Sequence, residues 1–225
     1  VVGYTTHNSG GVPDNFKNWF IVRFDRKIRD FQIYDGTKPV GGEQLVGEHA
    51  LVRVGFETRR GEQVTARVAS SFISQMQAVQ NLEELGKDDF ETVKAKAQAR
   101  WDEVLGRIEV EGGTTDQYRT FYSCLYRSTL FPRKFYEIDK NGNILHYSPY
   151  NGEVLPGYMY TDTGFWDTFR SLFPLLNLVY PSVNAEIQAG LANAYRGRHC
   201  DALRGDARRT PEGTPHGELH RALGV

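Results

Sequence analysis

The chain has 225 residues, of which 40% are hydrophobic, so it can bury a substantial core as one large domain or as parts of two. Its formal net charge of −1 gives no broad attraction to nucleic-acid phosphates or to anionic membrane surfaces. Nucleic acid is therefore excluded as an expected partner, and no apolar run is long enough to predict a membrane span.

The first third of the chain has the pattern of an antiparallel β-sandwich. Short aromatic and β-branched runs at 19–24 and 31–34 are bounded by Asp, Lys and Gly. Two further runs, 51–56 and 64–68, alternate apolar and other residues in the way that half-buried strands do. The residues between these two runs, 59–62, predict a hairpin turn that would pair them.

The pattern changes after Ser74, and residues 75–113 are predicted to form linker helices. The first helix covers 75–85 and ends at Gly86. The second begins near Asp89 with a sequence of the capping-box type, and its apolar residues recur every three or four positions. We expect these residues to form one stripe that faces a neighbour. The stripe consists of Phe90, Val93, Ala97, Trp101, Val104, Leu105 and Ile108.

A third helix is predicted after the glycine pair 112–113. Thr114 and Gln117 have the spacing of a capping box, and an apolar stripe of mostly aromatic residues follows until Pro132 ends the helix. Consecutive amphipathic helices after a β region indicate a linker that leads into a helical domain, which we place at residues 114–195 after a sandwich at residues 1–74.

Residues 135–147 predict a β-hairpin. Asn141 and Gly142 lie between two apolar or aromatic segments, and both residue types accept positive φ. A calcium loop of the EF-hand kind does not fit this segment, because glycine comes too early and no glutamate closes the loop.

The segment 157–176 combines aromatic residues, two carboxylates and an arginine around one predicted helix start. Apolar residues continue at helical spacing after Asp167, so a core would hold this helix while its first turn faces a cavity. Trp166 and Asp167 would then supply what sugar recognition needs, a flat apolar ring and a carboxylate that accepts hydrogen bonds from hydroxyls. The alternative is structural: Asp167 caps the helix and pairs with Arg170, and Trp166 belongs to the core.

The run from Tyr160 to Leu176, centred on Phe165-Trp166-Asp167-Thr168-Phe169-Arg170, resembles the entry to the helical domain of glycoside hydrolase family 92, the exo-acting α-mannosidases. The similarity continues through earlier blocks in the family's order and covers about half of the chain. It implies an N-terminal β-sandwich, linker helices and a catalytic (α/α)6 barrel, of which this chain holds the first part. The earlier blocks are Ala99-Arg100-Trp101, Ile108 to Gly113, Phe121-Tyr122, Leu125-Tyr126 and Pro132-Arg133.

The resemblance also implies an activity. Members of the family remove terminal α-linked mannose from glycans by inverting hydrolysis, assisted by a bound calcium ion that helps to distort the sugar and position the attacking water. By the same resemblance, Asp167 is expected to accept hydrogen bonds from mannose hydroxyls, Trp166 to shape the pocket and Arg170 to orient the carboxylate. The catalytic acid and base are expected outside this chain, which holds no identified calcium ligand and is expected to be inactive alone.

Two further expectations concern location and function. Members of the family are generally exported, so the resemblance implies a periplasmic or extracellular protein. The alternative function is a non-catalytic carbohydrate-binding module, since sandwich folds often serve that role.

Residues 196–225 differ in composition from the rest of the chain. They are rich in arginine, glycine and proline and contain no aromatic residue to anchor them in a core, so we expect a disordered tail. The abrupt change at Arg196 also favours an altered reading frame or a truncated gene model.

Overall fold

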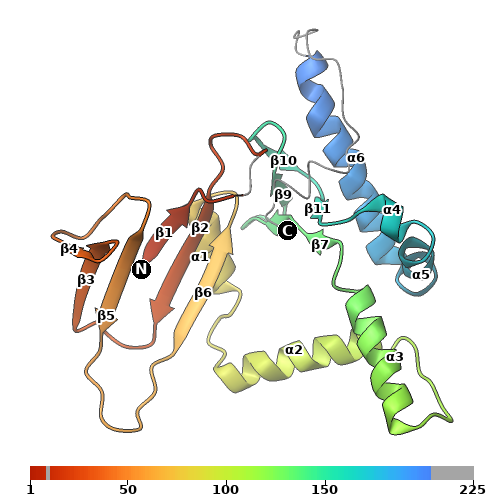
Figure 1. The fold of residues 1–225 in the computed structure, drawn as a ribbon, viewed down its shortest axis with the longest axis horizontal. Coiled ribbons are helices and arrows are strands. Elements are labelled where there is room, and N and C mark those ends of the chain that lie inside the picture. The colour runs from red at the N-terminus through yellow and green to blue at the C-terminus, as the bar shows by residue number, and fades with distance from the viewer. Residues whose placement is uncertain (9–10, 204–225) are drawn as a thin grey trace.

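The computed structural model of the protein describes residues 1–8 and 11–203. Two small antiparallel sheets come first, then helices α1 to α3, a second group of short strands and finally helices α4 to α6 (Figure 1). This succession of a β region, connecting helices and a helix-rich region confirms the order that the sequence predicts.

The N-terminal strands form two sheets of three strands each. The first sheet has the order β1–β2–β6, with β1 at Val2–Thr5, β2 at Asn18–Phe24 and β6 at Ala66–Ser71. The second has the order β4–β3–β5, with β3 at Asp30–Asp35, β4 at Lys38–Val40 and β5 at Ala50–Gly55.

The predicted hairpin around residues 59–62 is wrong. The turn itself forms, because the N–H of Glu62 donates to the carbonyl of Arg59 at 3.1 Å. However, β5 pairs with β3 and β6 pairs with β2, so the segment crosses from one sheet to the other. Alternation of apolar residues specifies which face of a strand is buried, but it does not specify the partner strand.

Helix α1 (Gln75–Glu83) belongs with the first sheet. The hydroxyl of Ser74 caps it by accepting a hydrogen bond from the N–H of Gln77 at 3.1 Å. Ala78 and Leu82 pack on Ile21 of β2, and the three side chains form a small buried cluster. The first predicted linker helix is therefore part of the packing of the N-terminal sheet.

Helices α2 (Phe90–Leu105) and α3 (Thr115–Ser128) begin where the sequence predicts. The side chain of Asp89 caps α2, and Thr114 and Gln117 form a reciprocal capping box at α3.

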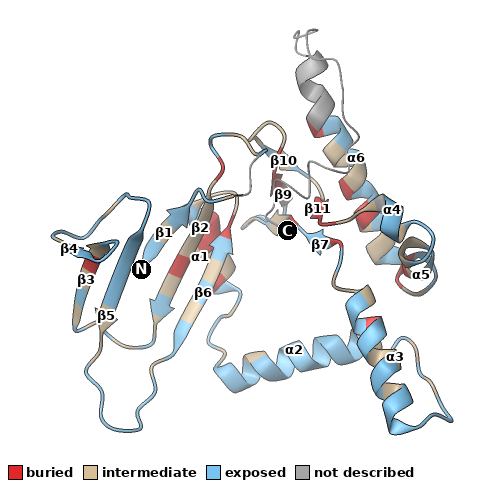
Figure 2. Cartoon of the chain, viewed as in Figure 1, coloured by how far each residue is buried: buried red, intermediate tan, exposed pale blue. Residues whose placement is uncertain are grey.

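The apolar stripe of α2 is covered only at its C-terminal end. Val104, Leu105 and Ile108 pack against a core cluster, and the ring centroid of Trp101 lies 4.6 Å from that of Tyr126. No residue of α2 is buried (Figure 2), and Phe90 is 70% exposed. The expectation that the whole stripe faces a neighbour is therefore wrong within the described residues, because helical spacing creates an apolar face without providing its partner.

The second group of strands contains the predicted hairpin. The sheet order is β10–β9–β8, and β7 pairs separately with β11. At the hairpin tip the carboxylate of Asp139 accepts hydrogen bonds from the N–H groups of Asn141 and Asn143, both at 2.8 Å, and Gly142 has φ 82°. The strands are β7 (Arg133–Lys134), β8 (Glu137–Ile138), β9 (Ile144–Tyr147), β10 (Val154–Pro156) and β11 (Tyr160–Thr161).

The single helix predicted from Asp167 onward is wrong. The chain forms α4 (Phe165–Thr168), turns, and then forms α5 (Leu172–Val179). Pro174 explains the break, because proline lacks an N–H and its ring clashes with the carbonyl four residues earlier. Proline is tolerated in the first turn of a helix, so α5 starts just before it.

Helix α6 (Pro181–Leu203) continues past Arg196, where we expected order to end. The remainder of the predicted tail, residues 204–225, lies outside the described residues. No helix in the described part of the chain is long and apolar enough to cross a membrane.

His146 on β9 generates the first prediction, which concerns the stability of the fold. It is 1% exposed, its Nδ1 lies 2.8 Å from the carbonyl oxygen of Gly157, and burial lowers its pKa below the ordinary 6.5. At a pH between the two pKa values, the unfolded chain therefore binds a proton at His146 that the folded chain does not bind. The contribution of neutral His146 to the free energy of unfolding should be fully present above about pH 6.5. It should decrease as the pH falls from there toward the lowered pKa of the folded state.

Urea denaturation at several pH values measures this effect. The His146→Gln variant should lose most of the acid dependence of the free energy of unfolding between about pH 6.5 and 5. The exposed His49→Gln variant is the matched control and should keep it. An unchanged acid dependence in His146→Gln would show that another group is responsible.

Candidate functional site

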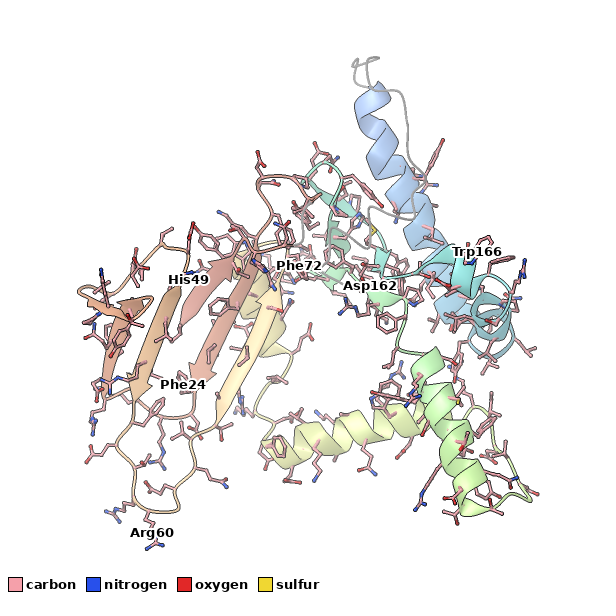
Figure 3. The ribbon with its side chains drawn as sticks, in the orientation of Figure 1. Phe24, His49, Arg60, Phe72, Asp162 and Trp166 are labelled. Carbon is pink, nitrogen blue, oxygen red and sulfur yellow. The ribbon has the colours of Figure 1, made fainter. Side chains whose placement is uncertain are left out.

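The candidate site lies where the chain leaves the core after β11. Met159 and Tyr160 are 1% and 4% exposed, so they anchor the strand. Six residues later, Trp166 is 85% exposed on α4. Figure 3 shows Asp162 on the inner side of this segment and Trp166 at its outer edge.

Asp162 is the most unusual residue of this segment. Its φ is 61°, a left-handed backbone conformation that non-glycine residues seldom adopt. Its side chain is 2% exposed, and Oδ2 accepts hydrogen bonds from the guanidinium of Arg133 on β7. The ion pair therefore joins the residue after β11 to the strand that pairs with β11.

Three oxygen atoms beside this ion pair are buried without a hydrogen-bond partner among the described residues. They are Oδ1 of Asp162 and the hydroxyl oxygens of Thr161 and Thr163. Buried polar atoms are nearly always paired, and strained backbone is concentrated at functional sites. These residues belong to the run from Tyr160 to Leu176 that resembles the family, but nothing in their local sequence pattern indicates burial or strain.

The structure contradicts the structural alternative for Trp166 and Asp167. Trp166 is exposed instead of lying in the core, and Asp167 lies within α4 instead of preceding it as a cap. The ion pairs found in the described part of the chain do not include Asp167 with Arg170. The guanidinium of Arg170 instead lies 4.9 Å from the ring centroid of Phe169. The roles of all three residues in mannose binding stay predictions.

Glu186 on α6 holds the anchor strand from the other side, and the sequence analysis missed it. Its Oε2 accepts hydrogen bonds from the hydroxyls of Tyr160 at 2.8 Å and Tyr136 at 3.3 Å. Burial and the neighbouring carboxylate raise the pKa of Tyr160 far above its ordinary value, so this phenol stays a donor. Because Glu186 is far from both tyrosines in the chain, no local motif could have indicated the contact.

The described residues do not offer a complete calcium site. No group of three or more His, Cys, Asp or Glu side chains lies together in this part of the chain. Calcium binds through six to eight oxygen ligands, with carboxylates prominent among them. The calcium that the resemblance implies therefore cannot be assigned to these residues alone.

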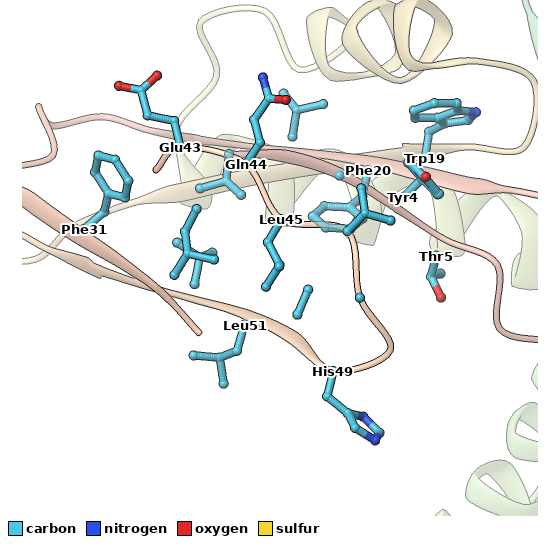
Figure 4. A pocket seen from close by; sticks show the side chains of 18 of the residues that line it. Tyr4, Thr5, Trp19, Phe20, Phe31, Glu43, Gln44, Leu45, His49 and Leu51 are labelled. Atoms are coloured by element: carbon cyan, nitrogen blue, oxygen red, sulfur yellow. The ribbon is translucent and has the colours of Figure 1, made fainter. Parts of the chain in front are cut away.

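A large hollow lies elsewhere, between the two N-terminal sheets. Its volume is about 1410 Å³, and Figure 4 shows apolar side chains such as Phe20, Leu45 and Leu51 along it. At one end the rings of Tyr4 and Trp19 lie 4.8 Å apart, but the ammonium of Lys17 sits 4.5 Å from the Tyr4 ring centroid. The hollow is therefore an incompletely filled space between two sheets. Its aromatic pair, contacted by Lys17, does not offer a free surface on which a sugar could stack.

Comparison with known proteins finds similarity to glycosidases of one family. The catalytic-domain model of glycosyl hydrolase family 92 matches residues 77–212. A solved inverting mannosidase of this family from Bacteroides thetaiotaomicron is 45% identical, with a TM-score of 0.83 over 87% of this chain. A second α-mannosidase from the same bacterium, solved with mannoimidazole, is 25% identical, with a TM-score of 0.68 over 91% of this chain.

Among curated proteins, an uncharacterized secreted glycosidase from Arthroderma benhamiae is 43% identical over 77 residues, or 32% of this chain. The chain spans 10% of that glycosidase, and it spans 27% and 26% of the two solved mannosidases.

Asp162 generates the second prediction. Replacing it with Asn should lower the free energy of unfolding by about 1–2 kcal/mol, because the buried side chain loses the charge that binds Arg133, while the half-exposed guanidinium regains water. Asp162→Ala should cost about 1 kcal/mol more, because alanine disfavours the left-handed backbone that asparagine tolerates. Urea denaturation measures both, and equal stability of the two variants would contradict the backbone argument.

Proposed function

Because this chain belongs to glycoside hydrolase family 92, we propose that the full-length protein removes terminal α-linked mannose from glycans by calcium-assisted inverting hydrolysis. The observation that carries the proposal is the 45% identity to an inverting mannosidase over 87% of the chain, at a TM-score of 0.83. A mannose-containing glycan is the proposed substrate, in line with the mannoimidazole complex of the second relative.

The described residues contribute binding groups to this reaction. Trp166 presents an exposed ring and Asp167 an exposed carboxylate from the same short helix. A ring of this kind packs on the C–H face of a pyranose, and a carboxylate accepts hydrogen bonds from neighbouring hydroxyls. The Arg133–Asp162 ion pair holds the backbone just before α4, so these two groups start from a defined position.

The catalytic acid and base are proposed to lie on other residues of the full-length protein. Inverting glycosidases need two carboxyl groups about 6.5–9.5 Å apart, one to protonate the leaving oxygen and one to activate water. Near α4, the carboxylate of Asp162 is bound to Arg133 and that of Glu186 to two tyrosines. In each carboxylate one oxygen, Oδ2 of Asp162 and Oε2 of Glu186, is engaged in a structural contact. Calcium, when bound, would help to distort the sugar and orient water, and its ligands would also lie mainly outside the described residues.

Export from the cytoplasm is part of the proposal. It rests on the family resemblance and on the secreted glycosidase to which the chain is similar.

The third prediction tests the proposed activity. The full-length protein should release the aryl group from an aryl α-mannoside in the presence of calcium and should lose this activity on chelation. The 225-residue chain should show no release under the same conditions, because the family resemblance places the catalytic acid and base on residues outside it. Calcium-dependent turnover by the 225-residue chain would show that the acid and base lie within it.

The fourth prediction concerns Asp167, for which we propose a role in binding, not in proton transfer. Charge-assisted hydrogen bonds are worth about 1.5–3 kcal/mol each, so Asp167→Asn in the full-length protein should lower kcat/KM by about tenfold or more. Because Asp167 is exposed, the melting temperature should stay within about 2 °C of the wild type. Wild-type kinetics for Asp167→Asn would refute the assignment, and the exposed Asp116→Asn on α3 is a control for the lost charge.

A further inference from the structure

Strand β8 is held by groups that come from the N-terminal unit, which comprises β1 to β6 and α1. The Oε1 atom of Glu137 accepts hydrogen bonds from the hydroxyl of Ser71 at 3.0 Å and from the N–H of Phe72 at 2.9 Å. Its Oε2 atom accepts from the side-chain amide of Asn81 at 2.7 Å. One carboxylate on β8 thus binds the end of β6, the residue after it and helix α1.

Neighbouring contacts reinforce the same junction. The side-chain amide of Gln77 donates to the carbonyl of Ile138 at 2.8 Å. Beside this polar contact, the ring centroids of Phe72 and Phe135 lie 4.7 Å apart, and Phe72 is labelled in Figure 3 between the N-terminal sheets and the second group of strands. An apolar contact excludes water from the junction, and charge-assisted hydrogen bonds define its orientation.

The segment that carries Glu137 continues directly to the candidate site. The N–H of Phe135 donates to the carbonyl of Met159 at 2.9 Å, and β7 pairs with β11. Arg133 at the start of this segment binds Asp162. Residues 133–138 are therefore held at one end by the N-terminal unit and at the other by the strand that leads to Trp166 and Asp167.

The covalent connection between the two ends of this junction is long and offers little rigidity. Between Phe72 and Arg133 the chain runs through α1, α2 and α3, and α2 has no buried residue. Only the C-terminal end of α2 packs against a core cluster, so this helix restrains the parts that it joins only weakly. The direct contacts at Glu137 supply a restraint that the helical connection lacks.

We propose that Glu137 is a positioning residue: its carboxylate fixes the N-terminal unit against residues 133–138 and thereby sets the position of the Trp166–Asp167 site. This inference rests on the proposed mannosidase function. Glu137 itself does not contact the sugar and transfers no proton. Its three donors all come from the N-terminal unit, so removing its charge weakens every one of these hydrogen bonds at once.

The test compares Glu137→Gln with Glu84→Gln in the full-length protein. Glu84 is an exposed residue at the end of α1 and controls for the loss of one negative charge. At a temperature where both variants are fully folded by circular dichroism, Glu137→Gln should lower kcat/KM for an aryl α-mannoside by about tenfold, and Glu84→Gln should not change it. A purely structural role would lower the melting temperature and leave the kinetics of the folded protein unchanged, and that result would overturn the proposal.

Amide hydrogen exchange supplies a readout that does not depend on activity. In Glu137→Gln, exchange should speed up by about tenfold at the N–H of Phe72, whose acceptor becomes a neutral amide oxygen, and also at the N–H of Phe135, which lies toward the site. Faster exchange at Phe72 alone would mean that the contact is local and would overturn the positioning role. If the wild-type protein hydrolyses no α-mannoside, the proposed function fails, and the exchange at Phe135 alone decides whether Glu137 positions this segment.

A second variant keeps the proposal falsifiable if Glu137→Gln does not fold. Asn81→Ala removes one of the three donors and should produce smaller changes in the same direction. Where both variants fold, Asn81→Ala should add little to the loss of kcat/KM in the Glu137→Gln background, because the two side chains act through one contact. Fully additive losses would show that the two side chains act independently and would overturn the proposal.

Discussion

The pairing of β7 with β11, closed by the ion pair between Arg133 and Asp162, is the contact on which the rest of the candidate site depends. It brings the segment before the hairpin against the motif that follows the hairpin, and the buried Tyr160 between them is bonded to α6 through Glu186. Without this contact, the loop that leads to the exposed α4 would be unsupported. With it, Trp166 and Asp167 project from a backbone that is held on two sides.

This support has an energetic cost, which is concentrated in a few residues. Asp162 adopts a left-handed backbone, and three oxygen atoms around it are buried without partners among the described residues. Each such feature disfavours the folded state by an amount on the order of 1–3 kcal/mol. Proteins retain arrangements of this kind mainly where a ligand or the mechanism needs them, and the position of Asp162 five residues before Asp167 fits that pattern.

Local chemistry determined much of the fold in advance. Ser74, Asp89 and Thr114 cap helices because their side-chain oxygens satisfy backbone N–H groups only a few residues away. The turn at Gly142 follows from the same short range. Pro174 belongs in this class too, since its effect on the preceding carbonyl was readable from the sequence, although apolar spacing alone led us to predict one continuous helix.

Which strands pair and which side chains meet was decided only by the tertiary structure. Alternation predicted a half-buried face for the strands that became β5 and β6, but their pairing with β3 and β2 depends on strands elsewhere in the chain. The same holds for Glu137, Glu186 and Asp162, whose contacts join residues separated by 26 to 66 positions. The sequence patterns reflect contacts between residues that are close in the chain. They were therefore sufficient to predict most of the elements and to indicate the family motif. The long-range contacts that make a site out of them arise only when the chain has folded and distant side chains share one low-dielectric interior.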